Sequence, residues 1–228
     1  MRDLLLAWFD ERGRDLPWRR TRDPYAILVS EVMLQQTQAA RVVPRYLDWL
    51  ERWPSVESLA AAPAAEVIRA WQGLGYNRRA LNLQRAAQAV AAGGWPDDLT
   101  TLPGVGRYTA DAVARFAFGH PVLPVDVNVR RVLERTGFAF DHSCAQALMD
   151  LGATVCIARL PRCGDCPLAA GCPSRGRRYE PLRKQGPFEG SFRQRRGAAL
   201  RALLDGADPA DDEAVAALAR DGLVPSAD

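Results

Sequence analysis

The sequence has little lysine, little histidine and no long hydrophobic run. Among its 30 basic residues, Lys184 is the only lysine, so chemistry that needs a lysine amine has one side chain to draw on. His120 and His142 stand apart from each other, which favours structural or solvated roles over catalysis. No apolar stretch is long enough to cross a bilayer, and the first residues lack the pattern of a signal peptide. We therefore expect a cytoplasmic protein without a membrane partner.

Cysteine is also scarce, and its placement argues against a secreted disulfide framework. Four of the five cysteines follow one another with the spacing C-x6-C-x2-C-x5-C: Cys156, Cys163, Cys166 and Cys172. Four thiolates in so short a stretch can surround one metal centre, either a tetrahedral zinc ion or a [4Fe–4S] cluster. Zinc ribbons usually carry two C-x2-C pairs, and this segment has one. Cys144 stands outside the set, and we expect it to be a small core or surface residue.

The composition is that of a soluble globular protein, with 228 residues, 48% hydrophobic and 25% charged. This length suffices for one large or two small domains. The net charge is only +3, but arginines crowd between residues 175 and 201. Such a segment favours a polyanionic partner, although many basic runs are simply solvated surfaces.

Helical periodicity runs through nearly all of the chain, and no stretch alternates as a strand does. We predict an all-α fold without an internal repeat. The predicted helices cover 2–12, 23–40 (opened by Asp23 as cap and Pro24 as first residue), 41–52 (with Pro44 in its first turn), 55–62, 64–72, 78–92, a helix from 107, one after 126, 143–155, 191–204 and 210–220. Residues 174–190 are polar, contain Gly and Pro, and indicate a linker. We expect the polar C-terminus to fray.

Glu31 is the one charged residue between Asp23 and Arg41. Helical spacing places Ile27, Leu28 and Leu34 around it. A carboxylic acid in such surroundings would be desolvated, which raises its pKa and suits a general acid working near neutral pH. The alternative is an acid exposed at a helix edge or paired with an arginine.

The stretch from Leu102 to Val132 joins a glycine turn to a helix and then to an acid. Gly104 and Gly106 would let backbone N–H groups approach a phosphate at the start of the following helix, although an ordinary helix-turn-helix fits as well. Asp126 suits an N-cap, and it also suits a carboxylate held near a developing cation. Polar and aromatic residues at 35–37 and 73–76 could wedge into a base stack or serve as plain turn chemistry.

Seven motifs occur together and in order: LPWR (16–19), SEVMLQQT (30–37), GLGY (73–76), LPGVGRYTA (102–110), VDVNVRRVL (125–133), ALMDLGATVC (147–156) and the four cysteines. With them the sequence resembles the helix-hairpin-helix DNA glycosylases of the endonuclease III superfamily over about residues 3–175. SEVMLQQT, which contains Glu31, is most similar to the branch that acts on adenine mispaired with guanine or 8-oxoguanine.

The resemblance implies roles for particular residues. Glu31 would protonate an extruded adenine, at N7, and help activate water, while Asp126 would stabilise the oxocarbenium-like sugar. The remaining residues would bind double-stranded DNA or its extruded base. Trp18, Arg19 and Asp150 would line or buttress the base pocket, Gln36 and Tyr76 would wedge at the mispair, and Gly104 and Gly106 would contact a phosphate. Tyr108 and Asn128 would be further substrate- or DNA-binding residues. The four cysteines would hold a [4Fe–4S] cluster.

The same resemblance implies a domain plan and a cellular setting. A six-helix domain with the hairpin would span 22–131, a cluster domain would combine 1–21 with 132–175, and 176–228 would form a basic linker and short helical tail. We expect a monomer associated with the nucleoid.

Several features depart from the family pattern. Residues 95–101 are few, which predicts a stunted first helix of the hairpin, and only 18 residues separate Arg131 from Asp150, which predicts a missing helix. Asp126-Val127-Asn128 stands where Asp-Gly-Asn is usual. The domain that reads 8-oxoguanine is not found, and the tail is similar to the short helical end of some bacterial adenine glycosylases.

Tyr108 occupies the position of the Schiff-base lysine of bifunctional relatives. We therefore predict hydrolysis of the glycosidic bond without an efficient lyase step. Three alternatives remain open: a thymine or uracil mismatch glycosylase of the same superfamily, a non-catalytic Fe–S DNA-binding protein, and an electron carrier, which would leave most of the chain unexplained.

Overall fold

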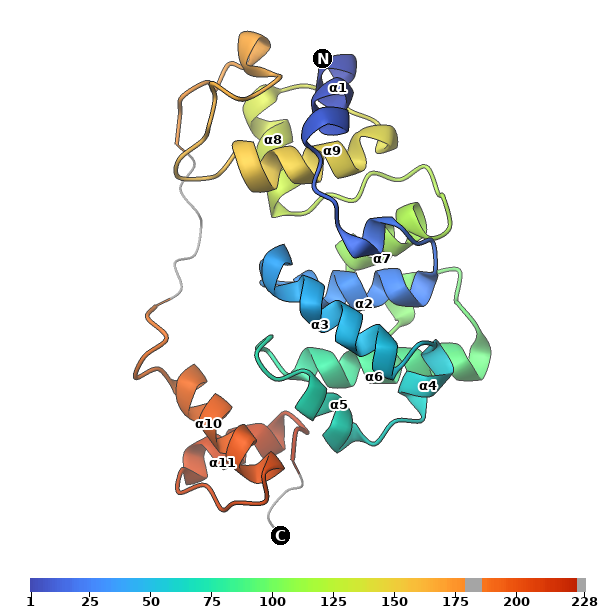
Figure 1. Ribbon diagram of the computed structural model, residues 1–228, viewed down its shortest axis with the longest axis vertical. Coiled ribbons are helices and arrows are strands. Elements are labelled where there is room, and N and C mark those ends of the chain that lie inside the picture. The colour runs from blue at the N-terminus through green and yellow to red at the C-terminus, as the bar shows by residue number, and fades with distance from the viewer. Residues whose placement is uncertain (179–185, 225–228) are drawn as a thin grey trace. The chain divides into compact units, whose positions relative to one another are not determined.

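The computed structural model describes residues 1–178 and 186–224. In these ranges the chain forms helices, turns and loops and no strand, so the predicted all-α class is confirmed (Figure 1). None of these helices combines the length and apolar character needed to span a membrane. The chain divides into two compact units, whose described parts are residues 1–27 with 106–178 and residues 28–105 with 186–224.

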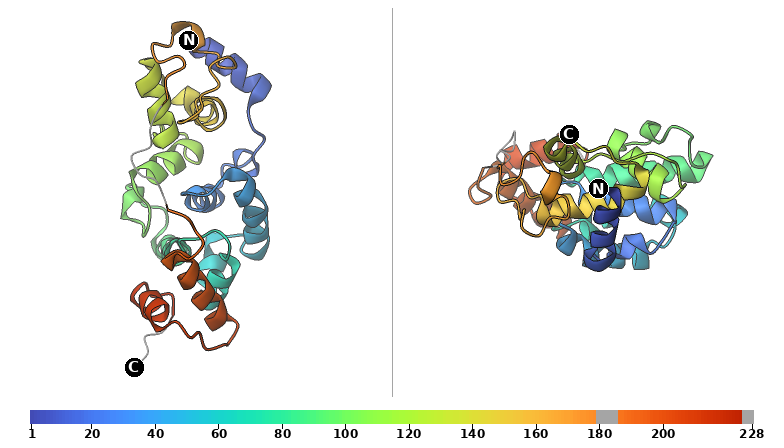
Figure 2. Two further views of the ribbon diagram at one scale, coloured as in Figure 1. Left: turned by 90° about the vertical axis from the view of Figure 1, so that its left-hand side faces the viewer. Right: turned by 90° about the horizontal axis from the view of Figure 1, so that it is seen from above.

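The first unit is built from helices of both ends of the sequence. It contains α1 (Arg2–Arg12), the start of α2 (Pro24–Leu34), α7 (Arg107–Phe116), α8 (Val127–Thr136) and α9 (Ala145–Asp150), with 3-10 turns at Pro17–Arg19, His142–Cys144 and Ala169–Gly171 and a π-helical turn at Leu151–Val155. Helix α9 packs against α1 and α8, as two views show (Figures 1 and 2). Their apolar faces share one core, with Leu5, Val132, Leu148 and Leu151 fully buried. Cys144 belongs to this core.

The second unit holds the rest of α2, α3 (Ala39–Arg52), α4 (Val56–Ala60), α5 (Ala64–Ala70), α6 (Arg78–Gly93), a 3-10 turn at Leu99–Thr101, α10 (Phe192–Leu204) and α11 (Asp212–Arg220). Helices α4 and α5 both pack on α6. Three indole rings fill the centre, with Trp49 in edge contact with Trp53 and Trp71 at centroid distances of 4.6 and 5.4 Å. Such contacts add to the free energy gained from burying the rings.

The two tail helices are part of this second unit. Helix α10 packs on α11, and their apolar residues form a buried cluster with Ile68 of α5 and Leu81 of α6. Arg69 donates a 2.6 Å hydrogen bond to the carbonyl of Leu204. The short helices predicted for 191–204 and 210–220 are therefore confirmed, and they lie on the α5–α6 surface.

Helix α2 begins as the sequence predicts and ends earlier. Asp23 caps it through a 3.0 Å bond from the Tyr25 N–H, and Pro24 is its first residue. The prediction that this helix continues to Ala40 is wrong, because the backbone of Gln36 takes a positive φ of 58° that no right-handed helix accommodates. Helix α3 then starts at Ala39, two residues before the predicted start, and continues through Pro44, which lies inside the helix rather than in its first turn.

Two segments that the sequence analysis found to be short each contain a single 3-10 turn. Between α6 and the glycine turn the chain forms one 3-10 turn, Leu99–Thr101, as the first element of the hairpin. Between α8 and α9 the described chain holds one further 3-10 turn, His142–Cys144. The helix predicted at 143–155 is a succession of 3-10, α and π turns. The π turn brings Gly152 so close to α8 that a Cβ there would lie 2.8 Å from Cβ of Asn128.

Candidate functional site

Glu31 lies inside the second unit on the last turns of α2. It is the only charged residue of this helix, and it is 5% exposed. Its helix neighbours Ile27 and Leu28 are buried as well. This excludes the alternative of an exposed acid at a helix edge and agrees with the predicted burial among apolar side chains.

Asp126 lies in the first unit and caps α8. Its Oδ1 accepts hydrogen bonds from the backbone N–H groups of Asn128 and Val129, at 2.9 and 2.7 Å. Its Oδ2 accepts a 2.8 Å bond from the Asn128 side-chain amide. The predicted N-cap role is confirmed, and the three donors fix the direction in which the carboxylate points.

Asn128 also links Asp126 to a buried arginine that the sequence analysis did not single out. Arg131, 7% exposed, donates to Asn128 Oδ1 at 2.9 Å and to the backbone carbonyls of Gly152 and Cys156 at 2.6 and 2.7 Å. The orientation of Asp126 is thus connected by hydrogen bonds to the backbone of the first cysteine of the set. With 29 arginines in the sequence, nothing in the pattern marked this one.

Asp150 lies in the same unit as Asp126, and its carboxylate has a side-chain exposure of 1%. Arg14 donates from Nε and Nη2 at 2.8 and 2.6 Å and from its backbone N–H at 2.8 Å, and Arg19 donates at 2.9 and 2.7 Å. Burial raises the pKa of Asp150, but the hydrogen bonds from Arg19 and Arg14 outweigh it and hold that pKa below its ordinary value. Asp150 therefore buttresses Arg19 from below the surface. Trp18, in the 3-10 turn with Arg19, is buried too.

The two predicted wedge residues both lie in the second unit and both have left-handed backbones. Gln36 has φ 58° and Tyr76 has φ 47°, and they are the two non-glycine residues with positive φ in the described parts of the chain. Both are exposed, Tyr76 to 48%. A hydrogen bond from Thr37 Oγ1 to the carbonyl of Leu74, at 3.4 Å, joins their two loops.

The glycine turn contains one glycine that its position requires. Gly104 has φ 77°, and a Cβ on it would lie 2.7 Å from Cβ of Asn82. Gly106 has an extended backbone and caps α7, whose first N–H groups follow it. Tyr108 lies half-buried on the first turn of α7. Gly104 and Gly106 are both exposed.

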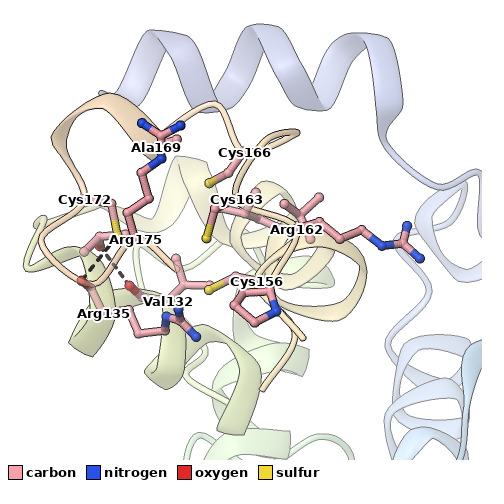
Figure 3. Close-up of a pocket in the computed structure, with 13 residues that line it drawn as sticks. Val132, Arg135, Cys156, Arg162, Cys163, Cys166, Ala169, Cys172 and Arg175 are labelled. Carbon is pink, nitrogen blue, oxygen red and sulfur yellow. Dashed lines mark hydrogen bonds between the residues drawn. The ribbon is translucent and has the colours of Figure 1, made fainter. Parts of the chain in front are cut away.

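All four cysteines of the set line one pocket of the first unit and are free thiols (Figure 3). Burial raises the pKa of the Cys156 and Cys166 thiols, since the charged form is penalised there. The Cys172 thiol donates a 3.5 Å hydrogen bond to the backbone carbonyl of Arg135. The Gly176 N–H donates a 3.2 Å hydrogen bond to the sulfur of Cys163. No three His, Cys, Asp or Glu side chains within the described residues are arranged to hold a single metal ion.

Comparison with known proteins identifies the family of this chain. The model of the HhH-GPD superfamily of base excision DNA repair proteins matches residues 29–152. An adenine DNA glycosylase of Mycobacterium tuberculosis is 45% identical, covering 87% of this chain and 77% of that protein. A human adenine DNA glycosylase is 41% identical over 83% of this chain and 42% of that protein.

Solved structures agree with this assignment. A thermostable thymine-DNA glycosylase has a TM-score of 0.68 at 29% identity, covering 75% of this chain and 93% of that one. A trapped covalent intermediate of endonuclease III with DNA has a TM-score of 0.65 at 27% identity, covering 75% and 92%. The chain belongs to the HhH-GPD superfamily of base excision DNA repair proteins.

Proposed function

We propose that this chain is an adenine DNA glycosylase that hydrolyses the N-glycosidic bond of adenine mispaired with guanine or 8-oxoguanine. The observation that carries the proposal is the 45% identity to an adenine DNA glycosylase across 87% of the chain. The buried acid of α2 and the capped carboxylate of α8 are the two groups that the chemistry needs. The reaction is base excision, and the partner is double-stranded DNA that contains a mispair. We further propose that the enzyme is a monomer and that it acts at the nucleoid.

Two carboxyl groups divide the chemistry. Glu31 donates its proton to N7 of an adenine turned out of the helix, which makes the base a better leaving group, and then helps to activate water. Asp126, fixed in direction by Asn128, stabilises the positive charge that develops on the sugar as the base departs. Neither step needs a covalent bond to the enzyme.

The remaining predicted residues bind and orient the DNA. Gln36 and Tyr76 contact the mispair, and Gly104, Gly106 and the start of α7 with Tyr108 receive a phosphate. Trp18 and Arg19 meet the extruded base, with Asp150 behind Arg19. These assignments are supported by exposure at the two loops and by the buried arginine–aspartate contacts.

The four cysteines fit a [4Fe–4S] cluster. Four thiols line one pocket of the described chain, and four cysteine thiolates are the ligand set that a [4Fe–4S] cluster takes. Cys156, Cys163, Cys166 and Cys172 would hold the cluster, which would stabilise the loop of residues 156–172 and would supply no step of the hydrolysis. Purified protein should be brown with on the order of four iron atoms per chain; stoichiometric zinc instead would contradict the assignment.

A second candidate is a thymine or uracil mismatch glycosylase, favoured by the fold similarity to a thymine-DNA glycosylase. A third is a DNA-binding protein without catalysis. Duplexes with A·G, A·8-oxoG, T·G or U·G, incubated with the protein and then treated with hot alkali, separate the three. Breaks at adenine alone support the proposal, breaks at T or U support the second candidate, and binding without breaks supports the third.

The acid can be tested by Glu31→Gln, which keeps the size and removes the proton donor. Adenine release should fall by a factor of about 10²–10⁴, as for other general acids, while DNA binding is retained. Glu57→Gln, an exposed acid of α4 in the same unit, serves as the control. Survival of near-normal turnover in Glu31→Gln would show that another group donates the proton.

A further inference from the structure

Two loops of the second unit hold a residue in a backbone conformation that costs free energy. The Gln36 loop (residues 35–38) follows α2, and the Tyr76 loop (residues 71–77) precedes α6. Gln36 and Tyr76 both have a positive φ angle, which residues other than glycine rarely adopt. Such conformations persist where neighbouring contacts impose them, and they concentrate at functional sites.

One arginine makes the contacts that hold both loops. Nη1 of Arg79 donates to the carbonyls at the end of α2 and beyond, at 2.7 Å to Val32 and 2.7 Å to Gln35. Its Nη2 donates to the carbonyls of Leu74 and Gly75 in the other loop, at 3.0 and 2.9 Å. In each loop, the carbonyl immediately before the left-handed residue accepts a hydrogen bond from Arg79. The two donors, Nη1 and Nη2, belong to one rigid planar guanidinium.

The surroundings of Arg79 favour an arginine over a lysine. Its acceptors are backbone carbonyls and the Thr37 hydroxyl, and its guanidinium lies 5.3 Å from the centre of the Trp71 ring and 5.7 Å from that of Tyr76. The carbonyls at the end of α2 carry the negative end of the helix dipole, which suits a cation. Burial lowers the pKa of Arg79 to about 10, so the group keeps all its donors at neutral pH. A lysine ammonium is a single point and cannot span both loops.

We infer that Arg79 is a positioning residue that locks the Gln36 and Tyr76 loops into one shape before DNA arrives. It acts through these two exposed side chains rather than by touching the scissile nucleotide. The inference rests on the proposed function in assigning the two loops to the mispair. The contacts of Arg79 order the Gln36 and Tyr76 loops together in the free protein. The conformational entropy of the two loops is therefore lost on folding and not on DNA binding.

The first measurement needs no activity. Hydrogen exchange on the free full-length protein compares wild type with Arg79→Lys at the amides of residues 34–37 and 73–76. We expect the exchange rate of these amides to rise by at least about tenfold, because local opening of the loops no longer has to break the hydrogen bonds from the Arg79 guanidinium. The matched control is Arg52→Lys, a half-exposed arginine of α3 paired with Glu66 in the same unit, which should leave both loops unchanged. Unchanged exchange in Arg79→Lys would overturn the inference.

The second measurement separates positioning from general stability. A duplex with an A·G mispair and 2-aminopurine beside the adenine reports extrusion. Arg79→Lys should weaken extrusion about tenfold in the wild-type background and less than about twofold when Gln36 and Tyr76 are both alanine, since coupled residues are non-additive. An equal loss in both backgrounds would overturn the inference. Thr37→Val, which keeps Arg79 and removes the hydroxyl between the loops, should give a smaller loss of the same kind.

Failure of the proposed function has a different signature. If wild-type protein releases no adenine but Arg79→Lys still loosens both loops, the lock stands and the substrate assignment falls. If adenine is released and the loops are indifferent to Arg79, the substrate stands and the lock falls.

Discussion

At the scale of single residues, substitutions of buried charged side chains should have the largest effects on stability. Asp150 is enclosed and faces two arginines, Arg14 and Arg19, whose side chains are 33% and 13% exposed. An ion pair of this kind contributes little net stability when whole, but losing one partner leaves buried charge without compensation. Removing the Asp150 carboxylate should therefore cost more stability than the intact ion pair contributes.

Asp150→Asn should lower the free energy of unfolding by about 3–5 kcal/mol at neutral pH, because both guanidinium groups lose their counter-charge. The pKa of Asp150 is held below its ordinary value in the folded protein. Its contribution is then complete above the unfolded pKa of about 3.9 and is lost as the pH falls through the folded value. The stability gap between wild type and Asp150→Asn should therefore close in acid, as urea denaturation at pH 7 and at several values below 4 would show.

Asp15→Asn provides the comparison, because Asp15 pairs with Arg20 at a fully exposed position. Exposed pairs are screened and contribute little, so this variant should unfold like wild type at neutral pH. A gap for Asp150→Asn that stayed constant down to pH 3 would mean that folding does not lower the pKa of Asp150.

At the scale of helices, the tail is an integral part of the second unit. Leu200 of α10 and Leu218 of α11 are almost fully buried against Ile68 and Leu81. Close by, Asp221 pairs with Arg196 and meets Arg78 of α6 at 4.0 Å. The tail thus packs beside the first residues of α6, directly before Arg79 in the sequence.

Leu200→Ala should destabilise the second unit by about 2–5 kcal/mol, the usual range for a buried leucine. Leu47→Ala on α3 is matched in size but half-exposed, and it should change stability by less than about 0.5 kcal/mol. Chemical denaturation of the full chain measures both. Equal stability of the two variants would show that the tail is not docked in solution.

Local signals in the sequence explain which elements were predicted correctly. Asp23-Pro24 located the start of α2 and Asp126 the start of α8. The end of α2 was missed because the strain at Gln36 is imposed by Arg79, 43 residues later, and no local pattern records it. Arg14 and Arg131 were missed for the same reason: their partners are Asp150 and Cys156, far along the chain.

At the scale of the whole molecule, the supply of amines limits the chemistry. A glycosylase that also cuts the strand does so through a Schiff base, which requires an uncharged amine at C1′ of the sugar. The chain has one lysine, Lys184, which lies outside the described residues, and the position expected for the amine holds Tyr108. We therefore predict that water is the nucleophile and that the product is an intact strand with an abasic site.

Adenine release from an A·G duplex should accordingly leave the strand whole until alkali is added, with spontaneous breaks below about a tenth of the alkali-induced breaks. Borohydride should trap little covalent complex, and Lys184→Ala should release adenine at the wild-type rate. Tyr108→Lys places an amine on the first turn of α7 and should raise the trapped fraction. Efficient strand cleavage by wild type, lost in Lys184→Ala, would instead mean that the amine of Lys184 takes part, and the reaction would then be amine-assisted rather than hydrolytic.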